Sequence, residues 1–219
     1  MNSTMMAGRP ALAETPSAAN GTDETDIALY LAQADPIDVL AAGGYLSGRD
    51  GTLIAGELRR PQLRKALEHS VCHTVAPNPD HFYQGDEEPD ATWRRRRATT
   101  IRDHCAVCPV RAVCAELALR DDDPHGLRGG LSQQKLAVRL KSEHERLARA
   151  RAEDTRSAQA QTDRIQAGAD VQRIAQQYTG NSIPATRRAE NTAAILAAVQ
   201  HRDNLRRTHR IAAGWTEAA

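Results

Sequence analysis

Aromatic residues are scarce in this chain. Of its 219 residues only 3% are Phe, Trp or Tyr, and a single Phe is present. Because the stability of a core scales with the apolar surface that it buries, a chain with so few large apolar side chains cannot fill one extensive core. The composition therefore predicts several small modules joined by polar segments.

Long hydrophobic runs are also missing. The first 20 residues contain neither the basic segment nor the apolar run of a secretory signal peptide, and no stretch approaches the length of a membrane span. We therefore expect a cytoplasmic protein with no membrane partner. In that reducing compartment, clustered cysteines serve more often as metal ligands or redox centres than as structural disulfides.

Strand-like alternation is absent over any useful length, whereas apolar residues recur with helical period between glycines and prolines. The sequence thus predicts an all-α protein. Short helices are expected at residues 27–31 and 37–40, and a pair broken at Pro61 is expected between Leu53 and His69. We divide the chain into a partly disordered N-terminal extension, a small helical four-cysteine domain, a helical linker and a basic C-terminal module, at residues 1–66, 67–140, 141–163 and 164–219.

All four cysteines lie in one stretch with the spacing C-x32-C-x2-C-x5-C. Four thiols are the number that encloses one zinc ion or one iron–sulfur cluster. Pro109 predicts a helix that opens there and runs to about Arg120, with Cys108 near its N-cap, where free N–H groups would face the sulfurs. The spacing alone does not choose between the metals. The candidate ligands are Cys72, Cys105, Cys108 and Cys114.

Three motifs occur in order around these cysteines: residues 78–83 (N-P-D-H-F-Y), the core C-x2-C-P-V-R-x2-C, and residues 126–132 (G-L-R-G-G-L-S). This combination resembles the WhiB-like proteins of actinobacteria and their phages, over about residues 70–140. The resemblance implies a small helical transcription factor whose four cysteines hold a [4Fe–4S] cluster that responds to oxygen or nitric oxide. It also implies binding to the C-terminal region of the primary sigma factor.

One residue departs from the family pattern. The turn after the cysteine helix usually reads G-[V/I]-W-G-G in that family, and here Arg128 stands at the tryptophan position. An arginine can stack and form salt bridges, but it cannot provide the apolar burial of a tryptophan. The resemblance makes this turn the candidate sigma-factor interface, and a plain helix-terminating turn is the alternative. The residues concerned are Gly126, Leu127, Arg128, Gly129 and Gly130.

Histidines and arginines surround the cysteines in the sequence. His73 and His104 are alternative ligands, although four thiols already complete a tetrahedral set. Four consecutive arginines at residues 94–97 would help to offset the negative charge of a thiolate-bound centre, but on a helix they cannot all face it. We expect most of them to be solvated or to contact nucleic acid, and Trp93 to pack in the interior.

After this turn, Ser132 is expected to cap a long helix with Leu136, Leu140 and Leu147 on one side. From residue 148 to 160 the pattern changes to Ala, Arg, Gln and Glu with almost no apolar stripe. That composition predicts a solvated helical spacer between the cysteine domain and the C-terminal module.

The net charge of +1 conceals an asymmetry. From Arg128 to the end there are 16 Lys and Arg against 9 Asp and Glu, whereas the preceding part carries a net charge of −6. A basic segment of this kind is the natural candidate for binding DNA. Within it, two short helices around a glycine turn at residues 179–182 resemble a helix-turn-helix, with a recognition helix that starts near Pro184. The candidate DNA contacts are Arg187 and Arg188 within that helix, and Arg202, Arg206 and Arg207 beyond its end.

Together these features predict an iron–sulfur transcriptional regulator that binds DNA and is not an enzyme. A zinc-stabilised DNA-binding protein without redox sensing is the first alternative. The second is a thiol–disulfide oxidoreductase that uses Cys105-x-x-Cys108, although this motif lies outside any βαβ pattern.

Overall fold

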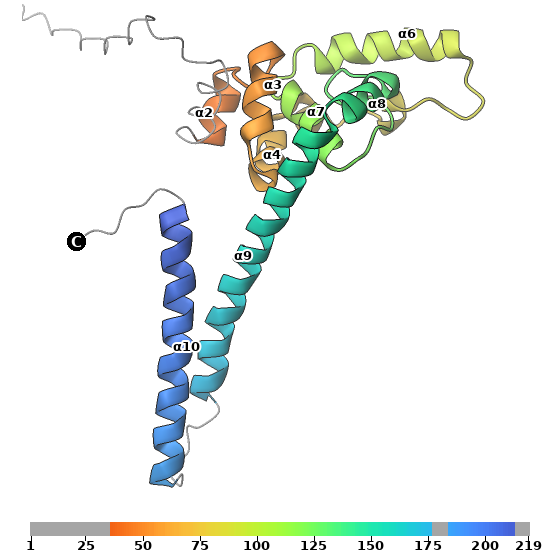
Figure 1. Cartoon of the computed structure of the whole chain (residues 1–219). Helices are drawn as coiled ribbons and strands as arrows, with labels where there is room; N and C mark the ends of the chain where they lie inside the picture. Colours follow the sequence, from red (N-terminus) through yellow and green to blue (C-terminus); the bar gives the residue numbers. More distant parts are fainter. Residues whose placement is uncertain (1–35, 177–183, 213–219) are drawn as a thin grey trace, which may run out of the picture.

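The computed structural model describes residues 36–176 and 184–212. In these two ranges the regular structure is helical, and one isolated bridge pairs Arg128 with Leu131. Figure 1 shows a helical head from which one long helix projects, with a second long helix lying beside its distal half. This arrangement confirms the predicted all-α class. The helix predicted at residues 27–31 and the turn predicted at residues 179–182 lie outside the described residues.

Three short helices begin the head: α2 (Ile37–Ala42), α3 (Gly48–Glu57) and α4 (Arg60–Ala66). Pro61 lies in the first turn of α4, so the predicted break at this proline is confirmed. Their apolar side chains form a core that continues without interruption into Cys108 and the residues that follow it. The N-terminal extension therefore packs directly on the cysteine segment. This core includes Leu40, Leu46, Ile54, Leu58, Leu63, Cys108, Val110 and Val113.

The next elements carry the cysteines. They are η1 (Leu67–His69), α5 (Val71–Val75), η2 (Pro79–Phe82), α6 (Asp90–Thr100), the π-helical turn η3 (Ile101–Cys105) and α7 (Arg111–Arg120). Trp93 of α6 is buried, as predicted. The helix predicted to open at Pro109 instead begins at Arg111 with Val110 as its N-cap, so Cys108 precedes the helix rather than capping it.

The helix predicted to run from Ser132 through Leu147 is wrong in its length. Ser132 does cap a helix, α8 (Gln133–Ser142), by accepting a hydrogen bond from Lys135 N–H at 3.5 Å. At Glu143 the backbone leaves helical geometry (φ −108°, ψ 15°), and α9 (His144–Gln176) begins after it. The break lets α8 and α9 fold onto α7, where Leu136 and Leu147 are buried together with Leu119.

The two long helices, α9 with 33 residues and α10 (Ala185–Ala212) with 28, form a hairpin rather than the predicted short helix-turn-helix. Helix α9 passes through position 163 without a break, because Ala, Gln, Glu and Arg favour helix and its one glycine, Gly168, is tolerated. Arg202, Arg206 and Arg207 lie within α10, so their predicted place beyond a short helix is wrong. No helix in the described ranges is both long and apolar enough to cross a membrane.

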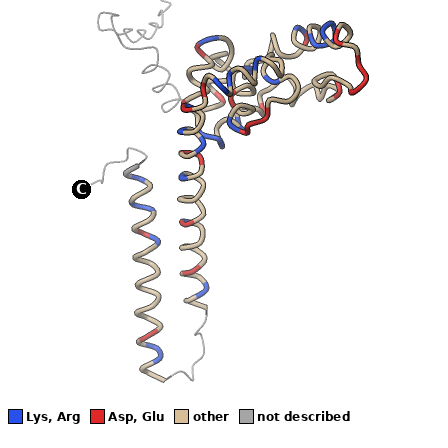
Figure 2. The backbone as a smooth tube through the Cα atoms, turned by 45° about the vertical axis from the view of Figure 1, so that its right-hand side comes forward, with Lys and Arg blue, Asp and Glu red and all other residues tan. Residues whose placement is uncertain are grey.

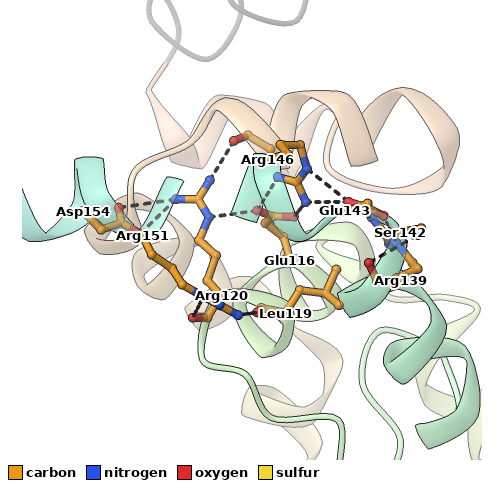
Figure 3. Close-up of polar contacts among 10 residues, drawn as sticks. Glu116, Leu119, Arg120, Arg139, Ser142, Glu143, Arg146, Arg151 and Asp154 are labelled. Atoms are coloured by element: carbon orange, nitrogen blue, oxygen red, sulfur yellow. Dashed lines mark hydrogen bonds and ion pairs between the residues drawn. The ribbon is translucent and has the colours of Figure 1, made fainter. Parts of the chain in front are cut away.

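A buried network of charges fastens the base of α9 to α7 (Figure 3). Glu116 accepts from Arg120 at 2.8 Å and from both terminal nitrogens of Arg146 at 2.9 Å. Arg120 also donates to Asp154 at 3.1 Å and to the carbonyl of Gly56 at 2.7 Å. Since the Glu116 and Arg120 side chains are only 2% and 3% exposed, their charges depend on one another for compensation.

Two further contacts extend this network to other elements. Asp154 accepts the backbone N–H of Arg60 at 2.9 Å, at the beginning of α4. Arg151 donates to the carbonyl oxygens of Leu119 and Arg120 at 2.7 and 2.9 Å, where α7 ends with unsatisfied acceptors. Helix α9 thus joins the N-terminal helices to the cysteine-bearing helix.

Replacing Glu116 by Ala should lower the free energy of unfolding by about 3–5 kcal/mol, because buried Arg120 would be left with Asp154 and Arg146 would lose both hydrogen bonds to Glu116. The matched control is Glu153→Ala on the exposed face of α9, where the pair with Arg156 is solvated and should contribute no more than about 0.5 kcal/mol. Urea unfolding of the full chain measures both. Equal effects of the two substitutions would contradict the central role of the buried pair.

Candidate metal centre

The four cysteines line a single cavity of about 290 Å³. Cys72 comes from α5, Cys105 from the end of η3, Cys108 from the turn before α7, and Cys114 from α7 itself. All four are free thiols; Cys105 and Cys108 are buried, Cys114 is partly buried and Cys72 is exposed. The fold therefore brings together all four cysteines that the sequence offered as ligands.

Local structure explains how each thiol reaches the cavity. Helix α5 has five residues. Its N-cap is Ser70, whose side chain accepts His73 N–H at 3.1 Å, and its C-cap is Ala76 in the left-handed region (φ 47°). This short helix holds Cys72 at the rim. Cys108 N–H donates to Cys105 O at 3.3 Å, which folds the C-x2-C step into a tight turn.

Burial raises the pKa of three of these thiols. The pKa of both Cys105 and Cys114 is raised to about 11, mainly because the surrounding protein disfavours a thiolate. Burial also raises the pKa of Cys72, with a further contribution from nearby Cys108. Thiols of this kind stay protonated near neutral pH unless a cation binds them, since a metal ion deprotonates the thiols that coordinate it.

Backbone N–H groups of the glycine turn point at the sulfurs. Gly129 N–H donates to Cys114 Sγ at 3.2 Å, and Gly130 N–H makes a hydrogen bond to Cys105 that partly offsets the effect of burial on its pKa. We predicted such donors at the start of the cysteine helix, and for these two sulfurs the turn provides them instead. Hydrogen bonds to ligand sulfurs are a common means of stabilising a negatively charged centre.

Only glycine suits the two positions of this turn. Gly129 and Gly130 have φ values of +54° and +77°, which a side chain disfavours. A Cβ on Gly129 would lie 2.4 Å from the carbonyl oxygen of Arg111 and 2.9 Å from Ala115 Cβ. The turn is therefore pressed directly against the helix that carries Cys114.

The five residues proposed as a partner interface lie around the same cavity. Gly126 and Leu127 are buried, and Arg128, Gly129 and Gly130 are partly buried. Leu127, Arg128 and Gly129 line the cavity beside the cysteines. The turn thus forms part of the cavity wall.

Other residues near the cysteines have distinct positions. His104 lines the cavity, its ring centroid 6.1 Å from that of Phe82, whereas His73 is exposed and outside the lining. The run at residues 94–97 lies on α6 away from the cavity lining, as its helical spacing suggested for most of it. The sequence pattern did not identify Phe82 as a wall of the site, although it belongs to the N-P-D-H-F-Y motif.

The thiols surround the cavity without converging on one point. In the described ranges, no group of three or more His, Cys, Asp or Glu side chains is placed to hold a single metal ion. A zinc ion binds its sulfurs at about 2.3 Å, which requires four thiols to meet closely at one centre.

A second candidate site lies between the two long helices. Their cleft has a volume of about 900 Å³ and is lined by Arg164 of α9 and by Arg206 and Arg210 of α10. Asp203, which also lines it, pairs with Arg202 at 2.8 Å, so positive charge is in excess. Figure 2 shows the charged residues of the hairpin spread along both helices. Of the other predicted DNA contacts, Arg187 and Arg188 are exposed in the first turn of α10.

The fold defines a small helical domain in which four cysteines line one cavity. Residues 67–140 match the family model described as transcription factor WhiB. Searches of curated proteins and of solved structures gave no match. The match confirms the resemblance on which the cysteine assignment rested.

Gly129→Ala should disrupt this site and destabilise the chain by about 1–2 kcal/mol or more, because a left-handed backbone penalises a Cβ and the new methyl would strike Arg111 O. Gly168→Ala is the matched control. Its Cβ would meet nothing within 4 Å, so alanine should stabilise α9 by about 0.5–1 kcal/mol. Thermal unfolding of both variants distinguishes the two directions; a neutral Gly129→Ala would contradict the described turn.

Proposed function

We propose that this chain is an iron–sulfur transcriptional regulator whose [4Fe–4S] cluster is held by Cys72, Cys105, Cys108 and Cys114. One observation carries the proposal: all four cysteines of a WhiB-family domain line the same cavity. The donor set is complete with four thiols, and the histidine in the lining is not required as a ligand.

The shape of the site favours a cluster over zinc. The cavity of about 290 Å³ has room for several metal atoms, and the thiols do not meet at one point. The N–H groups of Gly129 and Gly130 point at two sulfurs, an arrangement typical of iron–sulfur sites. A zinc-stabilised DNA-binding protein remains the first alternative and would have to draw the four thiols inward.

A thiol–disulfide oxidoreductase is less well supported. Such an enzyme needs an attacking cysteine whose pKa is lowered, so that thiolate is present near neutral pH. The raised pKa of Cys105 points the other way. The C-x2-C step of Cys105 and Cys108 is therefore better suited to binding metal than to exchanging disulfides.

We further propose that the regulator responds to redox conditions or nitric oxide. A bound [4Fe–4S] cluster supplies a centre that oxygen and nitric oxide can attack. The proposed ligands come from α5, η3, the turn before α7 and α7 itself, and Cys72 on the five-residue α5 is the exposed one among the four. Release of Cys72 would free this segment from the rest of the head.

Helix α7 connects the cysteine centre to the hairpin. It carries Cys114 and, two and six residues further on, Glu116 and Arg120, which bind α9. A change in the position of α7 is thus passed to α9 through buried ion pairs rather than through a solvated linker. This connection gives the ligand state of the cysteines a route to the DNA-binding part.

For DNA, we propose the cleft between α9 and α10 as the phosphate-binding surface. Three arginines give the cleft an excess of positive charge, and guanidinium groups bind phosphate well. Arg187 and Arg188, exposed in the first turn of α10, are the proposed base contacts. Arg202 has Asp203 as a partner at 2.8 Å and would contribute less than Arg206.

The C-terminal region of the primary sigma factor is the protein partner that family membership suggests. We propose the outer face of residues 126–130 and the adjoining α8 as its contact. Val138 of α8 is 64% exposed and lies beside Leu131 in a small groove. Co-purification of the cluster-loaded full chain with that sigma-factor region tests this part of the proposal, and no detectable complex would reject it.

Replacing any one of the four cysteines by Ala should abolish the visible absorption and reduce bound iron and sulfide, because one iron would lose its protein ligand. Iron and acid-labile sulfide are measured after anaerobic purification of the full chain. His73→Ala and His104→Ala are the controls and should retain the cluster. Bound zinc without sulfide in the parent protein would instead support the first alternative.

Arg164→Gln, Arg206→Gln and Arg210→Gln should each weaken DNA binding for all sequences and reduce the dependence of log K on log salt by about one unit, as expected for a lost phosphate contact. Arg173→Gln is the matched control, because Arg173 lies on α9 outside the cleft and pairs with Asp170 at 3.1 Å.

Arg187→Ala or Arg188→Ala should instead cost about 1–3 kcal/mol of discrimination between specific and scrambled duplexes. Salt-dependent titrations of the full chain separate these effects. If the cleft variants bind as the parent does, the hairpin is not the DNA surface and residues 94–97 become the better candidate.

A further inference from the structure

We infer that Arg128 is a positioning residue for the cysteine centre: it bridges Tyr83 and Asp123 and thereby holds the Gly129–Gly130 turn against the cysteine sulfurs. This inference rests on the proposed cluster-binding function. It assigns an internal role to the residue that stands where the family has tryptophan.

One nitrogen of the Arg128 guanidinium group donates two hydrogen bonds. Its Nη2 donates to Tyr83 Oη at 2.6 Å and to Asp123 Oδ2 at 3.2 Å. The guanidinium carbon lies 5.3 Å from the centre of the Tyr83 ring, so a cation–π contact adds to these hydrogen bonds. Only 27% of the side chain is exposed, which leaves little of it to meet an external partner.

The two anchors of this bridge are themselves fixed. Arg96 of α6 donates to Tyr83 O at 3.0 Å, and Leu127 N–H donates to the neighbouring Phe82 O at 2.8 Å. A Cβ on Gly126 would lie 2.7 Å from Phe82 O and 2.8 Å from the Tyr83 ring. The two chain segments at residues 82–83 and 126–128 are therefore in direct contact. Asp123 accepts His125 N–H at 3.1 Å, which fixes its carboxylate beside the turn.

The bridge acts on the sulfurs through the backbone. Arg128 and Leu131 exchange two hydrogen bonds, of 3.1 and 2.8 Å, which close the turn that contains the two glycines. The next two N–H groups after Arg128 are those that reach Cys114 and Cys105. The backbone of a glycine has wide conformational freedom. The Arg128 bridge therefore keeps the N–H groups of Gly129 and Gly130 directed at the sulfurs.

The bridge therefore affects the electronic properties of the bound centre. Hydrogen bonds to the sulfurs favour the more reduced, more negative state and so raise the reduction potential of a cluster. A tryptophan at this position could stack on Tyr83, but it could not bond both the phenol oxygen and the carboxylate, because its indole has one donor. Arg128 contacts both Tyr83 and Asp123, but it presents less apolar surface than a tryptophan would.

The test compares Arg128→Gln with Tyr83→Phe, with the double variant Tyr83→Phe/Asp123→Asn and with Arg94→Gln as control. Arg94 is exposed on α6 and donates to Asp90 O of the same helix at 3.3 Å. Two quantities are measured on the full chain: the reduction potential of the cluster-loaded protein, and hydrogen exchange of the Gly129 and Gly130 amides with and without the cluster.

Arg128→Gln should lower the potential and speed exchange of both amides by about tenfold, the effect of one lost charge-assisted hydrogen bond. The double variant should reproduce this change, Tyr83→Phe should show part of it, and Arg94→Gln should show none. Arg128→Lys, which keeps the charge but not the planar fork, should resemble Arg128→Gln in amide exchange.

Unchanged potential and exchange in Arg128→Gln would overturn the inference, as would an unaffected double variant. If a variant does not take up the cluster, amide exchange in the metal-free chain decides, because the bridge and the turn consist of protein atoms alone. Failure of the parent chain to bind iron and sulfide would reject the proposed function instead, so the two failures are distinguishable.

Discussion

The buried ion pairs of Glu116 and Arg120 are the constraint on which the arrangement of this molecule depends. A chain with 3% aromatic residues cannot join its parts through a large apolar interface, and it uses charges for this purpose. Removing such charges from water is costly, so the gain in net stability over an apolar contact is small. The network determines how α9 is positioned on α7. Asp154 of α9 contacts both Arg120 of α7 and the first turn of α4.

The cysteine domain also depends on sequence outside the segment that matches its family. The side chains of Cys108, Val110 and Val113 share a core with Leu46, Ile54 and Leu63 from the N-terminal helices. On the other side, Arg146, Arg151 and Asp154 of α9 cover the end of α7. The family match thus covers residues 67–140, while the packing that supports α7 extends from α2 to the base of α9.

Much of the site could be predicted because its signals are local. Cysteine spacing, the ordered motifs, Pro61 and the capping Ser132 each depend on a few neighbouring residues, and the structure agrees with them. The break at Glu143 and the full length of α9 were missed, because a helix-favouring sequence continues across 143 and only packing on α7 requires the interruption. The Glu116–Arg120 pair has a visible i,i+4 spacing, but its partners lie 30 and 34 residues away and no local pattern reveals them.

The length of α9 gives small movements of the head a large effect at the far end of the molecule. Its 33 residues span about 50 Å at 1.5 Å per residue. The ion pairs with α7 involve only residues in the first third of this helix. The 22 residues of α9 beyond Asp154 form a stiff arm of roughly 33 Å, so a tilt of about 5° near Asp154 displaces the end of the helix by roughly 3 Å. That displacement is close to the rise of one base pair, so in the regulator proposed above a small movement of α7 would shift a DNA-binding surface by about one phosphate.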